Sequence, residues 1–389
     1  MLPEVRMARI VDAIGGYHRR ELSCQEAAEL LAISERHFRR LRDRYEAEGA
    51  EGIIDRRRGR ASARRAPLDR IEWVIEQYRT RYFDFTVKHF HEELEKQGFE
   101  YGYTWTKSVL QSRGLVRPAL KRSAHRKKRA RKPLPGMMLF QDGSTHAWLC
   151  GQAPLDLIVT LDDATGEICS AFLVEEEGTF SSLRGLREVI ESKGLFGSLY
   201  TDRGSHYFLT PKAGEAVDKD QLTQVGRALK QLGIGHIPSY SPQGRGRMER
   251  VFGTLQNRLP QVLRLAGIDT IEEANRYLAE VYVSEYNARF AVEAAEPGDA
   301  FVPFVGDLAS ILCVQEDRVV GRDNTVRYAG LELQIPESRH RQHYVKVRVR
   351  VHAYEDGTLA LFHGPRCLAR YDAAGRLQEP RAEVKRSAA

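Results

Sequence analysis

The sequence has few cysteines and no long apolar run. Its five cysteines stand far apart, at Cys24, Cys150, Cys169, Cys313 and Cys367. An odd and widely spaced set argues against a disulfide framework and against a cysteine-based zinc site. No apolar stretch approaches the roughly 18 residues of a membrane-spanning helix, and the start, Met1-Leu2-Pro3-Glu4, lacks the basic and then apolar layout of a signal peptide. We therefore expect a cytoplasmic protein with no membrane partner.

The length and the charge of the chain indicate several domains and an anionic partner. A chain of 389 residues exceeds one ordinary core, which predicts two to four domains. The 60 Lys and Arg against 53 Asp and Glu give a net charge of only +7, so the distribution of charge matters more than its sum. Residues 101–141 hold eleven Lys and Arg and no acidic residue. This stretch favours a polyanionic partner, although a solvated linker would have the same composition.

Residues 1–54 have the signals of a compact helical domain. Ser23 and Glu26 form a capping box at the start of a short helix. After a tight turn, Ser34 caps a longer helix over 35–48. Two helices joined so closely indicate a helix-turn-helix, whose second helix enters the major groove of DNA; the alternative is a solvated basic helix in a structural bundle. The side chains of the longer helix that we expect to contact DNA are Arg36, Arg39 and Arg40.

Residues 68–118 repeat this architecture. Apolar spacing predicts a first helix, a second helix over 86–97 and a third helix that Thr104 caps. The pattern indicates a second helix-turn-helix domain, with Lys107 free to contact DNA. Two such domains in series would recognise a long, non-palindromic DNA site.

Arginine-rich segments flank this second helical domain. Residues 55–67 are too charged to pack, which indicates either a solvated tether or an arm whose arginines enter a minor groove. Residues 119–134 form a basic linker. The predicted DNA contacts at its centre are Arg126, Lys127, Lys128 and Arg129.

The composition changes at residue 135, where the element order of an α/β domain begins. Short apolar strands are predicted over 137–142, 155–161 and 167–174, and helices then alternate with further strands. Two long amphipathic helices follow, over 248–265 and 271–286. Three adjacent strands followed by this alternation are the order of a ribonuclease-H-like domain. We place this domain at 135–298.

The last region, 310–375, alternates with a period of two. In 344–351 every second residue is apolar, which turns valines inward and leaves a basic face. We expect a small antiparallel β-barrel whose basic face contacts DNA through Lys346, Arg348 and Arg350. The chain is then a multidomain α/β protein with N-terminal helix-turn-helix domains, a ribonuclease-H-like core and a C-terminal small β-barrel.

Three carboxylates of the central domain can converge. Asp142 and Asp202 each end an apolar strand, and Glu249 lies early on a helix after a glycine-rich turn. Converging carboxylates repel one another unless cations are present, and their oxygens prefer Mg²⁺ or Mn²⁺ to softer metals. Two such ions would suit phosphoryl transfer without a protein nucleophile. The flanking arginines that we expect to contact phosphates are Arg203, Arg245, Arg247 and Arg250.

Other polar residues of this domain have local explanations. Asp162 and Asp163 lie in a hairpin turn that ends in Thr165-Gly166, so we interpret them as turn formers rather than metal ligands. Residues 175–177, all glutamates, are interpreted as a solvated loop. His206 either contacts the attacking water or the DNA, or lies on the surface.

Three runs resemble the integrase catalytic core of bacterial DDE insertion-sequence transposases and retroviral integrases. They are Gln141-Asp142-Gly143, residues 201–205 and residues 241–255. The resemblance implies that Asp142, Asp202 and Glu249 hold two Mg²⁺ or Mn²⁺ ions in a DNA transposase. It also implies cleavage at transposon ends and attack of the resulting 3′-hydroxyls on target DNA.

The chain departs from the family pattern close to the glutamate. Many members have Asp-Asn shortly before it, where this chain has Gly246-Arg247, and a lysine seven residues after it, where this chain has Gln256. The interval between Asp202 and Glu249 is also longer than usual, which an insertion at 211–220 explains. Details of end recognition that those positions carry are therefore not transferred.

The expected partners are double-stranded DNA, as transposon ends and as target, and further copies of the chain. Strand transfer joins two ends, so at least a dimer is expected on DNA, associated with the nucleoid. The alternative is a sequence-specific DNA-binding regulator with an inactive integrase-like core, which would bind DNA without metal-dependent nicking. The two DNA-reading domains disfavour a third reading, a structure-selective nuclease.

Overall fold

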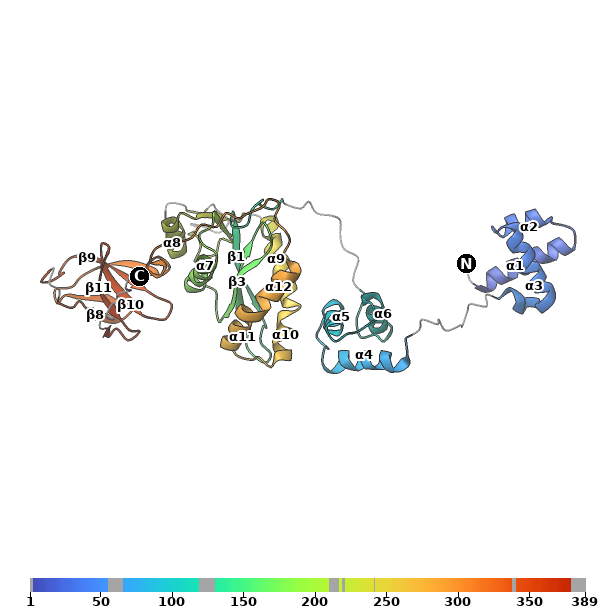
Figure 1. Cartoon of the computed structure of the whole chain (residues 1–389), viewed down its shortest axis with the longest axis horizontal. Coiled ribbons are helices and arrows are strands. Elements are labelled where there is room, and N and C mark those ends of the chain that lie inside the picture. The colour runs from blue at the N-terminus through green and yellow to red at the C-terminus, as the bar shows by residue number, and fades with distance from the viewer. Residues whose placement is uncertain are drawn as a thin grey trace, which may run out of the picture. The chain divides into compact units, whose positions relative to one another are not determined.

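The computed structural model describes most of the chain (Figure 1). The described residues are 3–54, 66–118, 130–209, 217–218, 221–240, 242–337 and 341–378. The charged residues at 55–65, most of the insertion at 211–220 and the basic contacts Arg126, Lys127, Lys128 and Arg129 lie outside them. The chain divides into two compact units, Met1–Trp73 and Val74–Ala389. Within the described ranges, no helix is both long and apolar enough to cross a membrane.

The first unit contains the predicted helix-turn-helix. Its elements are α1 (Pro3–His18), α2 (Cys24–Leu30), α3 (Glu35–Glu48) and a 3-10 helix, η1 (Gly49–Ile53). The capping box forms as predicted, since Glu26 N donates to Ser23 Oγ over 3.2 Å and Ser23 N donates to the Glu26 carboxylate over 2.7 Å. Phe38 and Leu41 of α3 are buried in the core that α1 and α2 share. This packing leaves Arg36, Arg39 and Arg40 of α3 exposed, whereas Arg42 is half-buried and donates to Tyr17 Oη over 3.2 Å.

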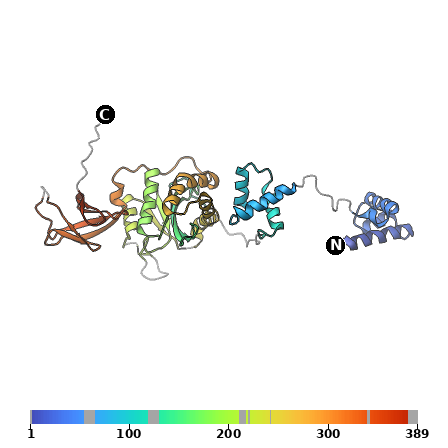
Figure 2. The same ribbon diagram turned by 90° about the horizontal axis from the view of Figure 1, so that it is seen from below.

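Three helices follow in residues 66–118, as predicted (Figure 2). They are α4 (Leu68–Thr80), α5 (Val87–Lys96) and α6 (Tyr103–Ser112). Thr86 caps α5 by accepting a hydrogen bond from His89 N over 3.3 Å. The prediction that Thr104 caps the third helix is wrong, because α6 begins at Tyr103 after Gly102 and has no side-chain cap.

A five-stranded mixed sheet forms the centre of the second unit. Its strands are β1 (Leu139–His146), β2 (Leu155–Asp162), β3 (Ile168–Val174), β4 (Ser198–Thr201) and β5 (Gly235–Pro238). The order is β3-β2-β1-β4-β5, with β3, β2 and β1 antiparallel and with β4 parallel to both β1 and β5. Three antiparallel strands followed by parallel ones match the sheet expected from the order of elements in the sequence.

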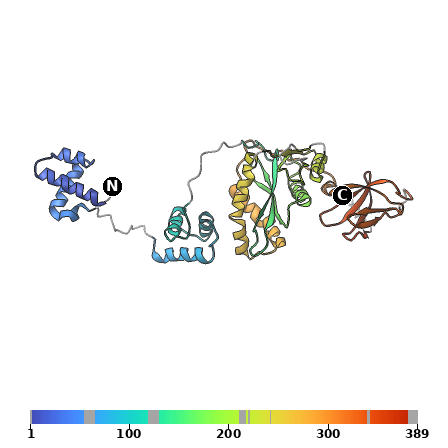
Figure 3. The same ribbon diagram turned by 180° about the vertical axis from the view of Figure 1, so that it is seen from behind.

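Helices cover both faces of this sheet (Figures 1 and 3). One face carries α7 (Thr179–Ser192) and α8 (Gln224–Leu232), and the other carries α9 (Pro242–Gln256), α10 (Leu259–Ala266), α11 (Ile271–Tyr277), the π-helical η2 (Leu278–Tyr282) and α12 (Val283–Phe290). Adjacent residues of β1 belong to different cores: Leu139 lies in the core that contains Leu186 of α7, and Phe140 lies in the core that contains Met248 of α9. The sequence predicted a single helix over 248–265, but the structure has two helices there, α9 and α10.

The C-terminal region forms an open sheet in the described residues, which do not show the predicted small β-barrel. Its elements are α13 (Leu308–Ile311), β6 (Val314–Val319), β7 (Thr325–Tyr328), β8 (Leu331–Gln334), β9 (Arg348–Ala353), β10 (Leu359–His363), β11 (Arg366–Tyr371) and β12 (Leu377–Gln378). The order β12-β11-β10-β9-β6 leaves both edges unjoined in the described residues, and β7 pairs only with β8. The strand predicted over 344–351 begins only at Arg348, because Lys346 adopts a left-handed turn with φ +63°.

Acid is expected to destabilise this sheet through His352, a buried residue of β9 that stacks on Phe362. Burial and then the charges of Arg227 and Arg350 lower the pKa of His352 to about 4 from 6.5. A folded-state pKa below the unfolded value gives stability that is full above pH 6.5 and is lost as the pH falls toward 4, up to about 3 kcal/mol. Urea unfolding of the wild type and of His352→Phe checks this between pH 7.5 and 4.5: the variant keeps the ring and should lose less stability, whereas parallel losses would contradict the assignment.

Candidate active site

The central sheet brings Asp142 and Asp202 to the same position along two neighbouring strands. Leu139 and Phe140 of β1 lie in register with Leu199 and Tyr200 of β4. This register, continued by two residues, aligns Asp142 with Asp202, which follows the last residue of β4. Neighbouring strands are separated by about 4.8 Å, so the two carboxylates start from adjacent backbone positions. Asp142 lies within β1 rather than at its end, which corrects the sequence expectation.

The surroundings of these two residues are strongly negative. Asp142 is buried, and Gly204 N donates to Asp202 Oδ1 over 2.8 Å, which fixes that side chain. The hydroxyl of the buried Tyr207 donates to Gln141 Oε1 over 3.0 Å. Burial and then the negative charges of Glu177, Asp142 and Asp202 raise the pKa of Tyr207 well above its ordinary value. A cation would relieve this concentration of negative charge.

Glu249 lies on the helix that packs over the same face of β1. Phe140 and Asp142 share a strand face by alternation, and Phe140 lies in the same core as Met248, the neighbour of Glu249. The Glu249 side chain is exposed in the middle of α9. The expected flexible turn before it is wrong, because α9 already begins at Pro242.

The carboxylates suit a hard divalent cation, but they do not form a preassembled site. Carboxylate oxygens are the ligands that Mg²⁺ and Mn²⁺ prefer, and Asp142 and Asp202 start from neighbouring strands. Among the residues that the structure describes, no three His, Cys, Asp or Glu side chains are grouped closely enough to hold a metal ion. The helix that carries Glu249 packs on the face of β1 that carries Asp142, but Glu249 is not part of a three-residue cluster in the described residues.

Glu177 is a neighbour of the site that the sequence analysis missed. Its side chain is only 25% exposed, and its Oε1 lies 3.4 Å from His206 Nε2. A Cβ atom on Gly143 would come within 2.3 Å of Glu177 Oε2, so the carboxylate needs the glycine beside Asp142. The reading of 175–177 as a solvated loop is wrong for this residue. A glycine within a strand often marks such a close approach, and Gly143 was the available signal.

The four flanking arginines differ in their surroundings. Arg203 lies over the Tyr240 ring at 5.2 Å, and Arg250 is exposed on α9. Arg247 instead ion-pairs with the fully buried Asp163 and donates to its carbonyl oxygen over 3.0 Å. The side chain of Arg245 lies outside the described part of the chain. Phosphate contact stays a prediction for this group.

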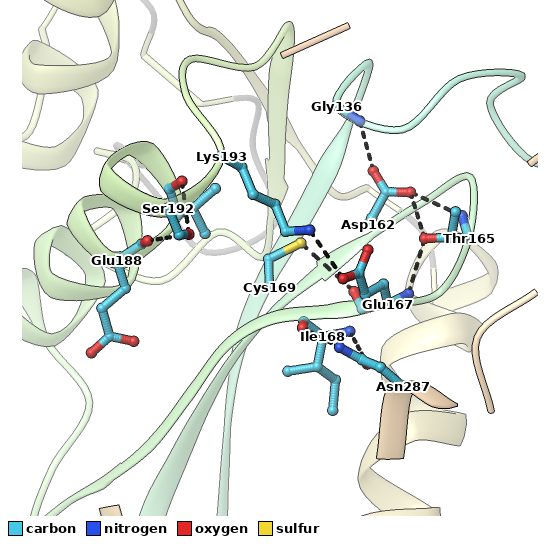
Figure 4. A network of polar contacts seen from close by, with 11 residues as sticks. Gly136, Asp162, Thr165, Glu167, Ile168, Cys169, Glu188, Ser192, Lys193 and Asn287 are labelled. Atoms are coloured by element: carbon cyan, nitrogen blue, oxygen red, sulfur yellow. Dashed lines mark hydrogen bonds and ion pairs between the residues drawn. The ribbon is translucent and has the colours of Figure 1, made fainter. Parts of the chain in front are cut away.

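The turn that contains Asp162 is a structural junction (Figure 4). Asp162 accepts hydrogen bonds from Gly136 N and Thr165 N, both over 2.9 Å, as a turn-forming aspartate would. Nearby, Lys193 pairs with Glu167 over 3.0 Å. Burial raises the pKa of the Cys169 thiol to about 12, so this cysteine is not a reactive thiolate at neutral pH.

The predicted DNA contacts outside the core are largely on exposed surface. On α3, Arg36 and Arg40 are exposed, and Arg39 pairs with Glu35 over 2.9 Å. Lys107 is half-buried on α6. In the C-terminal region Lys346 lies in a turn, Arg348 is exposed on β9, and Arg350 pairs with Asp317 over 3.1 Å. These contacts stay predictions.

Comparison with known proteins gives one family match and several relatives. The winged helix-turn helix family matches residues 17–70. The chain is 31% identical over 338 residues to the transposase-class protein y4bF of Sinorhizobium fredii, covering 86% of this chain and 73% of that one. It is 25% identical over 361 residues to the transposase for insertion sequence IS1202 of Streptococcus pneumoniae, covering 84% of this chain and 76% of that one.

Two solved structures are also similar. A chain of the simian T-cell lymphotropic virus intasome in complex with PP2A regulatory subunit B56 gamma aligns at 15% identity and TM-score 0.34, over 73% of this chain and 92% of that one. The HTLV-2 integrase catalytic core domain in complex with magnesium aligns at 18% identity and TM-score 0.28, over 38% of this chain and 90% of that one. With relatives of this identity matched along most of both sequences, the chain belongs to the transposases of bacterial insertion sequences.

Proposed function

We propose that this transposase binds the ends of its element and catalyses metal-dependent DNA strand cleavage and strand transfer. The observation that carries the proposal is the register of β1 and β4, which supports it because its continuation by two residues aligns Asp142 with Asp202 in a member of this family. Glu249, on the helix over the same face, is the third proposed ligand of two Mg²⁺ or Mn²⁺ ions.

The proposed chemistry needs positioning and charge neutralisation rather than a protein nucleophile. Two bound ions supply activation of the attacking oxygen and stabilisation of the leaving oxygen at phosphorus. The chain holds Asp202 through Gly204 N and keeps Asp142 largely out of water. Arg203, Arg245 and Arg250 are proposed to hold the DNA phosphates around these carboxylates.

DNA reaches the site through the flanking regions in this proposal. The helical domains at 1–54 and 68–118 read the ends, and the basic linker at 119–134 follows the backbone into the core at 135–298. The C-terminal sheet within 310–375 adds the exposed Arg348. Joining two ends also requires at least a dimer on DNA.

Strand transfer in a defined assay tests this proposal. The purified protein is incubated with labelled DNA from the element's ends and a supercoiled target, with Mg²⁺, with Mn²⁺ or with chelator. We expect the label to join the target only when metal is present, because the carboxylates alone cannot neutralise the charge that develops at phosphorus. Specific binding without nicking or joining in either metal would instead identify a DNA-binding regulator with an inactive core.

A further inference from the structure

Asp163 is a buried carboxylate that joins three segments of the core. It is fully buried. Its Oδ2 accepts from Lys132 N over 2.7 Å, and its Oδ1 pairs with the Arg247 guanidinium. Its carbonyl oxygen accepts from Arg247 over 3.0 Å and from Arg131 over 3.3 Å. If Arg247 were lost, the Asp163 carboxylate would remain buried without a compensating charge, which is strongly destabilising. We therefore expect the Asp163 carboxylate to keep Arg247 close to this turn.

The turn that presents Asp163 is fixed to the strand that carries Asp142. Asp163 N donates to Met138 O over 3.0 Å, immediately before β1, and Asp162 pairs with Leu139 of β1. Arg247 is two residues before Glu249 on α9. A short path of buried contacts therefore links the strand of one proposed metal ligand to the helix of another.

A second contact connects the last residue of α9 to β1. Gln256 Nε2 donates to Ser144 Oγ over 3.1 Å, and Ser144 shares a strand face with Asp142. Glu249 lies between these two ties. Both ties use positions at which the sequence departs from the family pattern, namely Arg247 and Gln256.

We propose that Arg247, through Asp163, is a positioning residue that sets α9 along β1 and so places Glu249 on the face that carries Asp142. In this proposal the Arg247 guanidinium contacts the Asp163 carboxylate rather than a DNA phosphate. Lys132 and Arg131, at the end of the basic linker, also donate hydrogen bonds to Asp163. The position where the chain enters the core and the position of α9 therefore both depend on Asp163. The inference rests on the proposed function, in which Glu249 binds metal.

Hydrogen exchange in metal-free protein and strand-transfer kinetics together test this proposal. In Arg247→Gln we expect faster exchange of α9 amides around Glu249 and a strand-transfer rate about 100-fold lower, the scale of an ångström-size misplacement. The Mg²⁺ concentration for half-maximal rate should rise, because Mg²⁺ demands near-ideal geometry. DNA affinity without metal should stay within about twofold, since no phosphate contact is lost.

Two further variants separate positioning from loss of fold. Asp163→Asn should speed exchange at α9 and also at Lys132, and the double variant Asp163→Asn with Arg247→Gln should be no slower in strand transfer than the worse single one. Arg276→Gln, an exposed arginine on α11, is the matched control and should match the wild type. If an Arg247→Gln preparation is unfolded, Arg247→Lys keeps the charge but replaces the guanidinium whose Nη1 contacts both Asp163 Oδ1 and the Asp163 carbonyl oxygen.

The outcomes distinguish this inference from the proposed function. Wild-type exchange and wild-type strand transfer in Arg247→Gln would overturn the positioning role. Loss of DNA affinity with unchanged α9 exchange would also overturn it and make Arg247 a phosphate contact. If the wild-type protein joins no DNA, the proposed function fails, whereas the exchange of α9 still decides whether Arg247 positions this helix.

Discussion

Replacing Asp202 with Asn is expected to lower strand cleavage and strand transfer by at least about 1000-fold. A metal that neutralises charge at phosphorus contributes several kcal/mol to the transition state, and about 4 kcal/mol corresponds to this factor. The amide keeps the size of the side chain and can still accept from Gly204 N, whose bond to Asp202 Oδ1 is 2.8 Å long. The fold of the turn should therefore survive while the charge is lost.

Binding and chemistry are measured separately in this experiment. Affinity for end DNA, determined without metal, should match the wild type, because the residue carries no positive charge and removing a nearby negative charge does not weaken phosphate contacts. Asp269→Asn is the matched control, since Asp269 is exposed in the connection between α10 and α11. Full activity of Asp202→Asn beside an unaffected control would remove Asp202 from the metal site.

Local patterns predicted the part of the site that the central sheet carries, although Asp142 lies within β1 rather than at its end. Apolar runs ending in Asp142 and Asp202 and the order of the surrounding elements predicted one sheet with these residues together, and the register of β1 and β4 fits that expectation. A short apolar run that ends at a carboxylate is a property of each strand alone, so it could be recognised without knowing the partner strands. The same is true of the caps at Ser23 and Ser34, which involve residues only three positions apart.

Contacts between distant segments could not be predicted in this way. Glu177 approaches Gly143 from the end of β3, and Arg247 reaches an aspartate 84 residues earlier. In the sequence, Glu177 stands in a run of glutamates that is typical of a solvated loop, and Arg247 stands among arginines that are typical of a phosphate-binding segment. The burial of both residues depends on tertiary packing, which these local patterns do not predict. The predicted barrel is not shown for a related reason. Closure depends on which edges pair, and the alternation in 344–351 does not predict whether β12 pairs with β6.

Replacing both Arg36 and Arg40 with Ala is expected to weaken binding to end DNA by at least about 100-fold, since a bidentate arginine contact to a base is worth about 1–3 kcal/mol. The two residues are four apart and so share one face of α3. Both are exposed, and no carboxylate in the described residues 3–54 forms an ion pair with either, whereas Arg39 is held by Glu35. The loss should appear in fluorescence anisotropy titrations with labelled end DNA.

The decisive quantity for these arginines is the ratio of specific to non-specific affinity. Base contacts carry sequence information and phosphate contacts do not, so the double variant should lose more affinity for end DNA than for unrelated DNA, and its salt dependence should fall only slightly. Arg19→Gln is the control, because Arg19 is exposed, lies outside α3 and pairs with Glu21 over 2.9 Å. Equal losses on both DNAs, with a salt slope reduced by about 0.9 per arginine, would show that α3 follows the backbone without reading bases.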